Sequence, residues 1–310
     1  MNPILISILN STNEMTPSIE KFEQGLPLKY DHAVDIISYC EENRIKIVTF
    51  LDENYPKKLL NDKTNPSLIF YKGRLDLIDT KCLGVVGSRA IDEYVVYQVK
   101  SAINRSDNTI VSGLAYGTDI LAHSEALKHD KDCIGVLPCG LNPEVFYPKT
   151  NYKYSYQIEE KGLVISMFLP NCKPKPYFFV LRNKFLVAIS DTIWIVKASV
   201  GSGTMTTANY TLESKKLLIV SPASLRETEY LGNLECIAKG GEILTSLDYF
   251  GEEKMQFIPS IKQSRILEDI KQGYNTIDLL MDNHEYIILL EELEQLVEAG
   301  VVTFHAGVYN

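Results

Sequence analysis

The sequence predicts an α/β protein whose central domain is a doubly wound, mostly parallel sheet. Short apolar runs rich in Val and Ile recur along the middle of the chain, and segments with helical spacing lie between several of them. Strands that alternate with helices form βαβ units, which build a parallel sheet covered by helices on both faces. The apolar runs are LGVVG, TIVSG, CIGVLPCG, LVISM, TIWIVKAS and LLIVSPAS, and the helical segments are DEYVVYQVKSAI, TDILAHSEALKH, NKFLVAIS and TMTTANYTLESKK.

Smaller regions are expected on both sides of this domain, which we place at residues 61–255. Residues 1–60 read as a short helical and irregular segment, in which HAVDIISYCEENRIKI has helical spacing. Residues 262–310 predict three helices and then a minimal hairpin around His305-Ala306-Gly307, which is the outline of a winged helix. This last region holds three basic and nine acidic residues, and the acidic ones include Glu291, Glu292 and Glu294 on its third helix. Because such a helix is a poor ligand for phosphate, we expect the winged helix to contact proteins.

Composition places the chain among ordinary globular proteins. Its 310 residues are 45% hydrophobic and 23% charged, with a formal net charge of -9. A protein whose whole surface grips nucleic acid is usually basic, so nucleic-acid binding here requires a local positive patch. The six cysteines form no CxxC pair or zinc-type spacing, which favours reduced thiols and no metal site. No apolar segment approaches a membrane span and the N-terminus lacks a basic signal region, so we expect a cytoplasmic protein without membrane contact.

Glycine-containing loops follow four of the predicted strands. They are Gly87-Ser88-Arg89, the stretch from Gly113 to Gly117, Cys139-Gly140, and Gly201-Ser202-Gly203-Thr204. In a parallel sheet such loops meet at the edge where ligands bind. Glycine lets backbone N–H groups face a ligand, helix N-termini favour anions, and a guanidinium suits phosphate. The pattern indicates an anion or nucleotide site, with plain turn chemistry as the alternative. GxGxxG and GxxxxGK[ST] are absent, which disfavours NAD, FAD and P-loop ATP.

Asp119 and His123 lie one helical turn apart behind the second of these loops, so their side chains can touch. One interpretation is a catalytic base that is oriented by a carboxylate. The other is structural, with Asp119 favoured in the first turn by the helix dipole and His123 held by an internal hydrogen bond. No GxSxG motif or metal triad accompanies the pair. We favour the structural interpretation and expect no catalytic residues.

Cations and aromatic residues are interleaved in KPKPYFFVLRNKFLVAIS, residues 173–190. In sites for single-stranded nucleic acid, cations follow the backbone and each ring can stack a base for about 1–3 kcal/mol. The alternative is a loop whose rings fill the core and whose lysines are solvated. Composition alone leaves both interpretations open. The residues concerned are Lys173, Lys175, Tyr177, Phe178, Phe179, Arg182 and Lys184.

A series of short motifs runs from Tyr55-Pro56 to the C-terminus. It comprises Tyr71-Lys72-Gly73, Val85-Val86-Gly87-Ser88-Arg89, Ser112-Gly113 through Asp119 with Ala122-His123, Tyr147-Pro148 with Asn151, Phe179 with Arg182-Asn183-Lys184, Ser202-Gly203-Thr204 with Thr207-Ala208, and the winged-helix tail. In this order the motifs resemble the DNA-processing protein A family, DprA, also called Smf. Departures mark a divergent member: Lys184 stands where Arg is usual, Ser221-Pro222-Ala223 stands where Pro-Gly is usual, and the N-terminal region is short.

The resemblance implies an extended Rossmann-like domain that forms a homodimer and binds single-stranded DNA without enzymatic activity or a cofactor. Members protect incoming single-stranded DNA and deliver it to the RecA recombinase in natural transformation and recombination. Carried over by motif, Arg89 contacts backbone phosphate, while Lys175 and Phe179 lie where members place a cation and a ring against the strand. The residues expected to bind DNA or phosphate are Gly87, Ser88, Arg89, Gly113, Gly117, Lys175, Phe179, Arg182, Asn183, Lys184, Ser202, Gly203 and Thr204. Asp119 and His123 are expected as structural neighbours. The alternative function is a nucleotide-binding sensor or nucleotide hydrolase of the same superfamily.

Overall fold

The computed structural model describes residues 31–62 and 65–250, together with positions 266, 269, 270, 293, 296, 302, 304, 305, 308 and 309. The chain divides into two compact units, residues 1–252 and 253–310, and each is considered by itself. Among the described residues, no helix is both long enough and apolar enough to cross a bilayer.

The first unit is built on a nine-stranded sheet in the order β1-β2-β6-β5-β4-β3-β7-β8-β9. The pairings β1–β2 and β2–β6 are antiparallel, and the other pairings are parallel. The α/β class with a mostly parallel sheet is thereby confirmed. The strands are β1 Lys46–Thr49, β2 Leu68–Gly73, β3 Cys82–Val86, β4 Thr109–Ser112, β5 Cys133–Val136, β6 Leu163–Ser166, β7 Thr192–Ile195, β8 Leu217–Val220 and β9 Glu242–Ile243.

The order of the parallel strands reverses at β3. From β3 the chain passes to β4, β5 and β6 on one side, and then returns to β7, β8 and β9 on the other side. The crevice at the carboxyl ends of β3 and β7 is therefore the topological switch point, where ligands of doubly wound sheets bind. The connecting helices are α5 Glu93–Arg105, α6 Thr118–Lys128, α7 Tyr152–Lys161, α8 Pro176–Ile189, α9 Gly203–Glu213 and α10 Leu231–Ala238.

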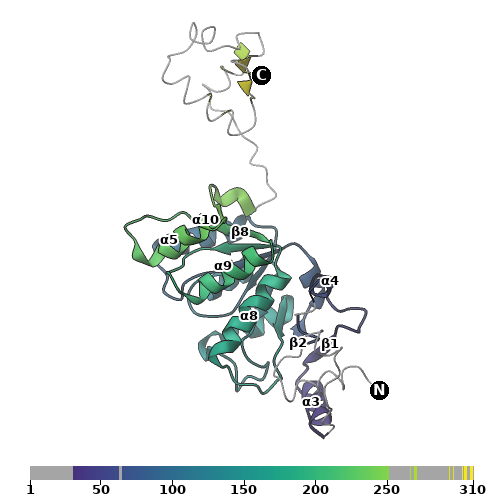
Figure 1. Ribbon diagram of the computed structural model, residues 1–310. Coiled ribbons are helices and arrows are strands. Elements are labelled where there is room, and N and C mark those ends of the chain that lie inside the picture. The colour runs from purple at the N-terminus through teal and green to yellow at the C-terminus, as the bar shows by residue number, and fades with distance from the viewer. Residues whose placement is uncertain are drawn as a thin grey trace. The chain divides into compact units, whose positions relative to one another are not determined.

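The core consists of two apolar layers, one on each face of the sheet. Successive strand residues point to opposite faces, so Leu83 and Val85 join one layer while Cys82 and Val86 join the other. The first layer takes side chains from α5, α6 and α7, and the second takes them from α8, α9 and α10. Figure 1 shows α8 and α9 lying across one face of the sheet. Because helices cover both faces, the inner strands read as unbroken apolar runs.

The N-terminal region differs from its expected helical character. The helix α3, Asp31–Glu42, ends before the predicted helical spacing does, and Arg44 takes a positive φ of 55°. Ile45 then donates from its backbone N–H to the Cys40 carbonyl, which is the hydrogen bond of a Schellman helix end. The chain continues into β1, which is one of the two outer strands of the sheet, and then into the short helix α4, Lys57–Leu60 (Figure 1). The domain boundary expected at residue 60 stays a prediction. Strand β1, which precedes residue 60, is part of the sheet.

The second unit contains the expected hairpin. Strand β10, Phe304–His305, pairs antiparallel with β11, Val308–Tyr309. Leu293, Leu296 and Val302 are buried, and the Val302 N–H donates to the Leu296 carbonyl. Most of the three helices expected before the hairpin lies outside the described residues, so the winged helix stays a prediction.

Candidate functional site

A cleft of about 330 Å³ lies at the switch point. The loop after β3 forms one wall, α8 forms another, and the N-terminus of α9 closes a third side. Ten of the expected site residues and neighbours line it: Gly87, Ser88, Arg89, Asp119, Phe179, Arg182, Asn183, Ser202, Gly203 and Thr204. Val86, Ala115, Leu186 and Ser199 complete the lining.

The loop after β3 is fixed in place by backbone contacts. The Ser88 N–H donates to the Lys197 carbonyl, and the Thr118 N–H donates to the Ser88 carbonyl. Gly117 has a φ of 74°, and a Cβ at this position would lie 2.4 Å from the Arg89 carbonyl oxygen. Only glycine permits this approach, so Gly117 acts by letting the two loops pack together.

Arg89 reaches the cleft from this fixed loop and is exposed. Its guanidinium carbon lies 5.6 Å from the centre of the Phe179 ring. Among the described residues, no hydrogen bond or ion pair involves this guanidinium. The nearby cation Lys197 differs, because its ammonium is buried and paired with Asp92 and Glu229. Arg89 therefore presents an uncommitted positive charge at the cleft.

The N-terminus of α9 provides a second anion-attracting element. The first N–H groups of a helix have no partner within it, and the dipole makes this end positive. Ser202 is the N-cap residue, but its side chain makes no capping hydrogen bond, and its buried hydroxyl has no partner in the described part of the chain. A Cβ added at Gly203 would meet nothing within 4 Å. Open space thus lies before this helix end.

Asp119 and Arg182 form a buried pair at the floor of the cleft. Arg182 Nη1 lies 3.8 Å from Asp119 Oδ2 and donates to the Val136 carbonyl at 3.2 Å. Asp119 accepts from the Gly113 N–H at 3.1 Å, and a Cβ at Gly113 would collide with the Arg182 guanidinium. Burial raises the pKa of the Asp119 carboxyl, and the Arg182 charge opposes that rise. Arg182 is 5% exposed and already paired with Asp119. Its direct contact with DNA stays a prediction.

His123 is buried and does not join Asp119 in a catalytic pair. Asp119 instead contacts Gly113 and Arg182, and neither ring nitrogen of His123 has a partner of good hydrogen-bond geometry in the described part of the chain. The Ser112 backbone acts on the ring as a hydrogen-bond partner, so the internal hydrogen bond expected for His123 stays a prediction. Burial lowers the pKa of His123 to about 4, because the imidazolium would lose its hydration.

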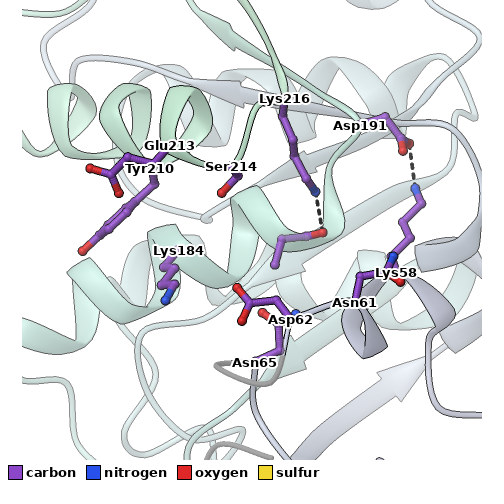
Figure 2. A pocket seen from close by; sticks show the side chains of 11 residues that line it. Lys58, Asn61, Asp62, Asn65, Lys184, Asp191, Tyr210, Glu213, Ser214 and Lys216 are labelled. Atoms are coloured by element: carbon purple, nitrogen blue, oxygen red, sulfur yellow. Dashed lines mark hydrogen bonds and ion pairs between the residues drawn. The ribbon is translucent and has the colours of Figure 1, made fainter.

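Two of the expected cations, Lys175 and Lys184, do not line the cleft. Lys175 is exposed at the N-cap of α8, with its ammonium 5.8 Å from the centre of the Phe178 ring. Asn183 Nδ2 donates to the Gly203 carbonyl at 3.4 Å and so joins α8 to α9. Lys184 lines a different cavity, which Figure 2 shows.

That second cavity, of about 610 Å³, is a junction between structural elements. Lys58 Nζ lies 2.6 Å from Asp191 Oδ2 and ties α4 to the loop before β7 (Figure 2). Lys216 Nζ donates to the carbonyls of Val187, Ala188 and Ser190, which end α8. Cations at the C-terminal end of a helix satisfy its open carbonyls. These two lysines serve the fold, so the smaller cleft is the candidate site.

Tyr147 lies near the site, and the sequence alone predicted no role for it. Its ring lies 5.8 Å from that of Phe179, with an interplanar angle of 88°. It comes from the loop after β5, whereas Phe179 belongs to α8. The signal available in the sequence was an aromatic residue beside a proline in a loop at a strand's carboxyl end.

The sheet and the cleft define a Rossmann-like domain with its candidate site at the switch point. The sequence profile of the family described as DNA recombination-mediator protein A matches residues 46–254. The chain therefore belongs to this family, whose relatives carry the names DprA and Smf.

Individual relatives agree with this assignment. The DNA processing protein DprA of Streptococcus pneumoniae is 33% identical over 200 residues, which cover 64% of this chain and 70% of the relative. A crystal structure of DprA from that organism has a TM-score of 0.64 at 30% identity, covering 73% of this chain and 77% of the other. DNA processing protein A from Helicobacter pylori has a TM-score of 0.58 at 30% identity, covering 66% and 94%, and its structure is described by its single-stranded DNA binding mode.

Proposed function

We propose that this protein binds single-stranded DNA across the switch-point cleft and acts in DNA processing during natural transformation and recombination. The observation that carries the proposal is the exposed Arg89 guanidinium, which rests on Phe179 without any polar partner among the described residues. The open N-terminus of α9 lies along the same cleft. Backbone phosphates can accept two hydrogen bonds from the Arg89 guanidinium and are attracted by the positive end of the α9 dipole.

A single strand suits this cleft better than a duplex does. Aromatic rings lie beside the cation, and unpaired bases can reach such surfaces while paired bases cannot. The net charge of -9 limits sequence-independent binding to a local patch. The single-stranded DNA binding mode of the Helicobacter pylori relative supports the same ligand.

The role beyond DNA binding is that of a non-enzymatic mediator. Family membership supports a homodimer that protects the strand and delivers it to the RecA recombinase. The contacts of Asp119 with Arg182 and Gly113 support the absence of acid–base chemistry at this cleft, because they leave the carboxylate without a described hydrogen bond to His123. The burial of His123 also keeps its imidazole away from any ligand.

The direct test is a titration of labelled single-stranded DNA with the wild-type protein and with Arg89→Ala. A charge-assisted contact to phosphate contributes about 1.5–3 kcal/mol, so we expect affinity to fall by roughly 10- to 100-fold. Arg105→Ala is a matched control, because Arg105 is exposed at the far end of α5 and outside the cleft. Equal binding by Arg89→Ala and wild type would refute the site.

The alternative is a nucleotide sensor or hydrolase that uses the same cleft. A volume of about 330 Å³ lies at the lower end of small-ligand sites. A thermal-shift screen against free nucleotides separates the two functions, because a ligand that binds only the folded state raises the melting temperature. Strong stabilisation by a nucleotide, with no binding of single-stranded DNA, would favour the alternative.

A further inference from the structure

Tyr147 presents an exposed ring beside the cleft. Its side chain is 36% exposed, and in the described part of the chain its hydroxyl has no hydrogen-bond partner. Its ring contact is Phe179, at 5.8 Å between ring centres and 88° between ring planes. A ring that is exposed in this way is available to a ligand, because it does not serve the core.

The backbone on both sides of Tyr147 is well anchored. Phe146 is 3% exposed and packs edge-on against Tyr152 at 5.3 Å between ring centres. Pro148 is buried. The ring is thus held at the surface by buried neighbours, which lowers the entropic cost of ordering it against a ligand.

Phe179 is poorly placed to receive a base by itself. The Arg89 guanidinium lies over its ring, and the ring is half-buried in α8. Rings in edge-to-face contact at 5.8 Å also leave no gap between them for a flat ligand. Phe179 lines the cleft and Tyr147 stands next to this lining, but Tyr147 is the more exposed ring of the pair and so offers a base the larger free surface.

We propose that Tyr147 is the nucleobase contact of the cleft, taking one unpaired base of a single strand on its ring. Phe179 has a different task, which is to hold Arg89 for the neighbouring phosphate. This assignment rests on the proposed function. It gives the contact with the base to Tyr147 and the positioning of the phosphate-binding cation to Phe179. Stacking on an aromatic side chain accepts every base, because each base has a π-face.

The test compares two oligonucleotides of equal length, an oligothymidine and its abasic counterpart, which keeps the phosphates and lacks the bases. Dissociation constants are measured for the wild type, Tyr147→Leu, Tyr147→Phe and Phe179→Leu. Tyr156→Leu is the control, because Tyr156 is 56% exposed on α7 and, unlike Tyr147, makes no described ring contact with a residue that lines the cleft. Melting curves verify that each variant is folded.

The wild type should bind the oligothymidine more tightly than the abasic strand. Tyr147→Leu should lower this ratio by about five- to tenfold while abasic binding stays unchanged, and Tyr147→Phe should retain the ratio. Phe179→Leu should weaken both oligonucleotides alike. An unchanged ratio for Tyr147→Leu overturns the assignment, and so does an equal loss with both strands. A wild type that binds neither strand refutes the proposed function itself, and the assignment with it.

Discussion

The Arg89 guanidinium lies over the Phe179 ring at 5.6 Å, and no other described residue pairs with it. A cation on an aromatic face gains about 0.5–1 kcal/mol at an exposed site, which is enough to favour one orientation without neutralising the charge. The loop that carries Arg89 is fixed to Lys197 and Thr118 through the backbone of Ser88. The charge is thus positioned before any ligand arrives.

Replacing Arg89 should change the salt dependence of DNA binding. Each phosphate contact to a single strand contributes about 0.7 to the slope of log affinity against log salt. We expect Arg89→Ala to flatten the slope by about 0.7. Arg89→Lys should keep the slope but lose part of the affinity, because an ammonium lacks the two-pronged geometry. A slope that is the same in Arg89→Ala and the wild type would show that this guanidinium meets no phosphate.

Two glycines at the cleft should respond differently to alanine. Gly203→Ala adds a methyl group where nothing lies within 4 Å, so the fold should tolerate it while DNA affinity falls. Gly117→Ala forces a side chain onto a φ of 74° and against the Arg89 carbonyl, so it should destabilise the fold by about 1–3 kcal/mol or more. Chemical denaturation and DNA titration of both variants distinguish these outcomes. Equal stability losses would contradict the open space assigned in front of α9.

His123 should make stability depend on pH. Its folded pKa of about 4 lies below the ordinary value of 6.5, so the unfolded state binds more protons between these values. Stability is therefore lost as pH falls from about 6.5 to about 4, by roughly 3 kcal/mol from this group. His123→Leu should remove that part of the loss in urea denaturation measured across the range. Identical pH profiles for wild type and His123→Leu would contradict the buried neutral imidazole.

The acidic C-terminal unit should be dispensable for holding DNA. We expect a chain ending at residue 252, the edge of the first compact unit, to keep its affinity for single-stranded DNA within about twofold, because residues 253–310 carry four basic and ten acidic residues. A melting curve establishes that the shortened chain is folded. Loss of binding by a folded, shortened chain would contradict the interpretation of this unit as a protein-contact module.

The parallel part of the fold could be predicted because buried strands leave a direct mark on the sequence. LGVV, TIVS and LLIV are unbroken apolar runs, and they became β3, β4 and β8. The strand β1 could not be predicted in this way, since KIVT is short and follows a helical pattern without a glycine or proline between them. Its start depends on Arg44 adopting the left-handed conformation, which non-glycine residues seldom signal.

The candidate site was only partly visible in the sequence. Glycine loops at strand ends predicted where the cleft lies, because parallel strands bring their carboxyl ends together. Side-chain direction was not predictable: Arg182 and Lys184 are two residues apart on α8, yet one lies in the floor of the cleft and the other lines a separate cavity. The Tyr147 contact with Phe179 joins residues 32 positions apart, and no local pattern reveals it.

The most direct measurement of the central claim is a competition experiment. Labelled single-stranded DNA bound to the wild-type protein is displaced with unlabelled single strand or with the duplex of the same sequence, and the series is repeated with Arg89→Ala. The account predicts that the single strand competes at far lower concentration than the duplex, and that Arg89→Ala loses most of its affinity for the labelled strand. Equal competition by duplex and single strand, together with unchanged binding by Arg89→Ala, would contradict it.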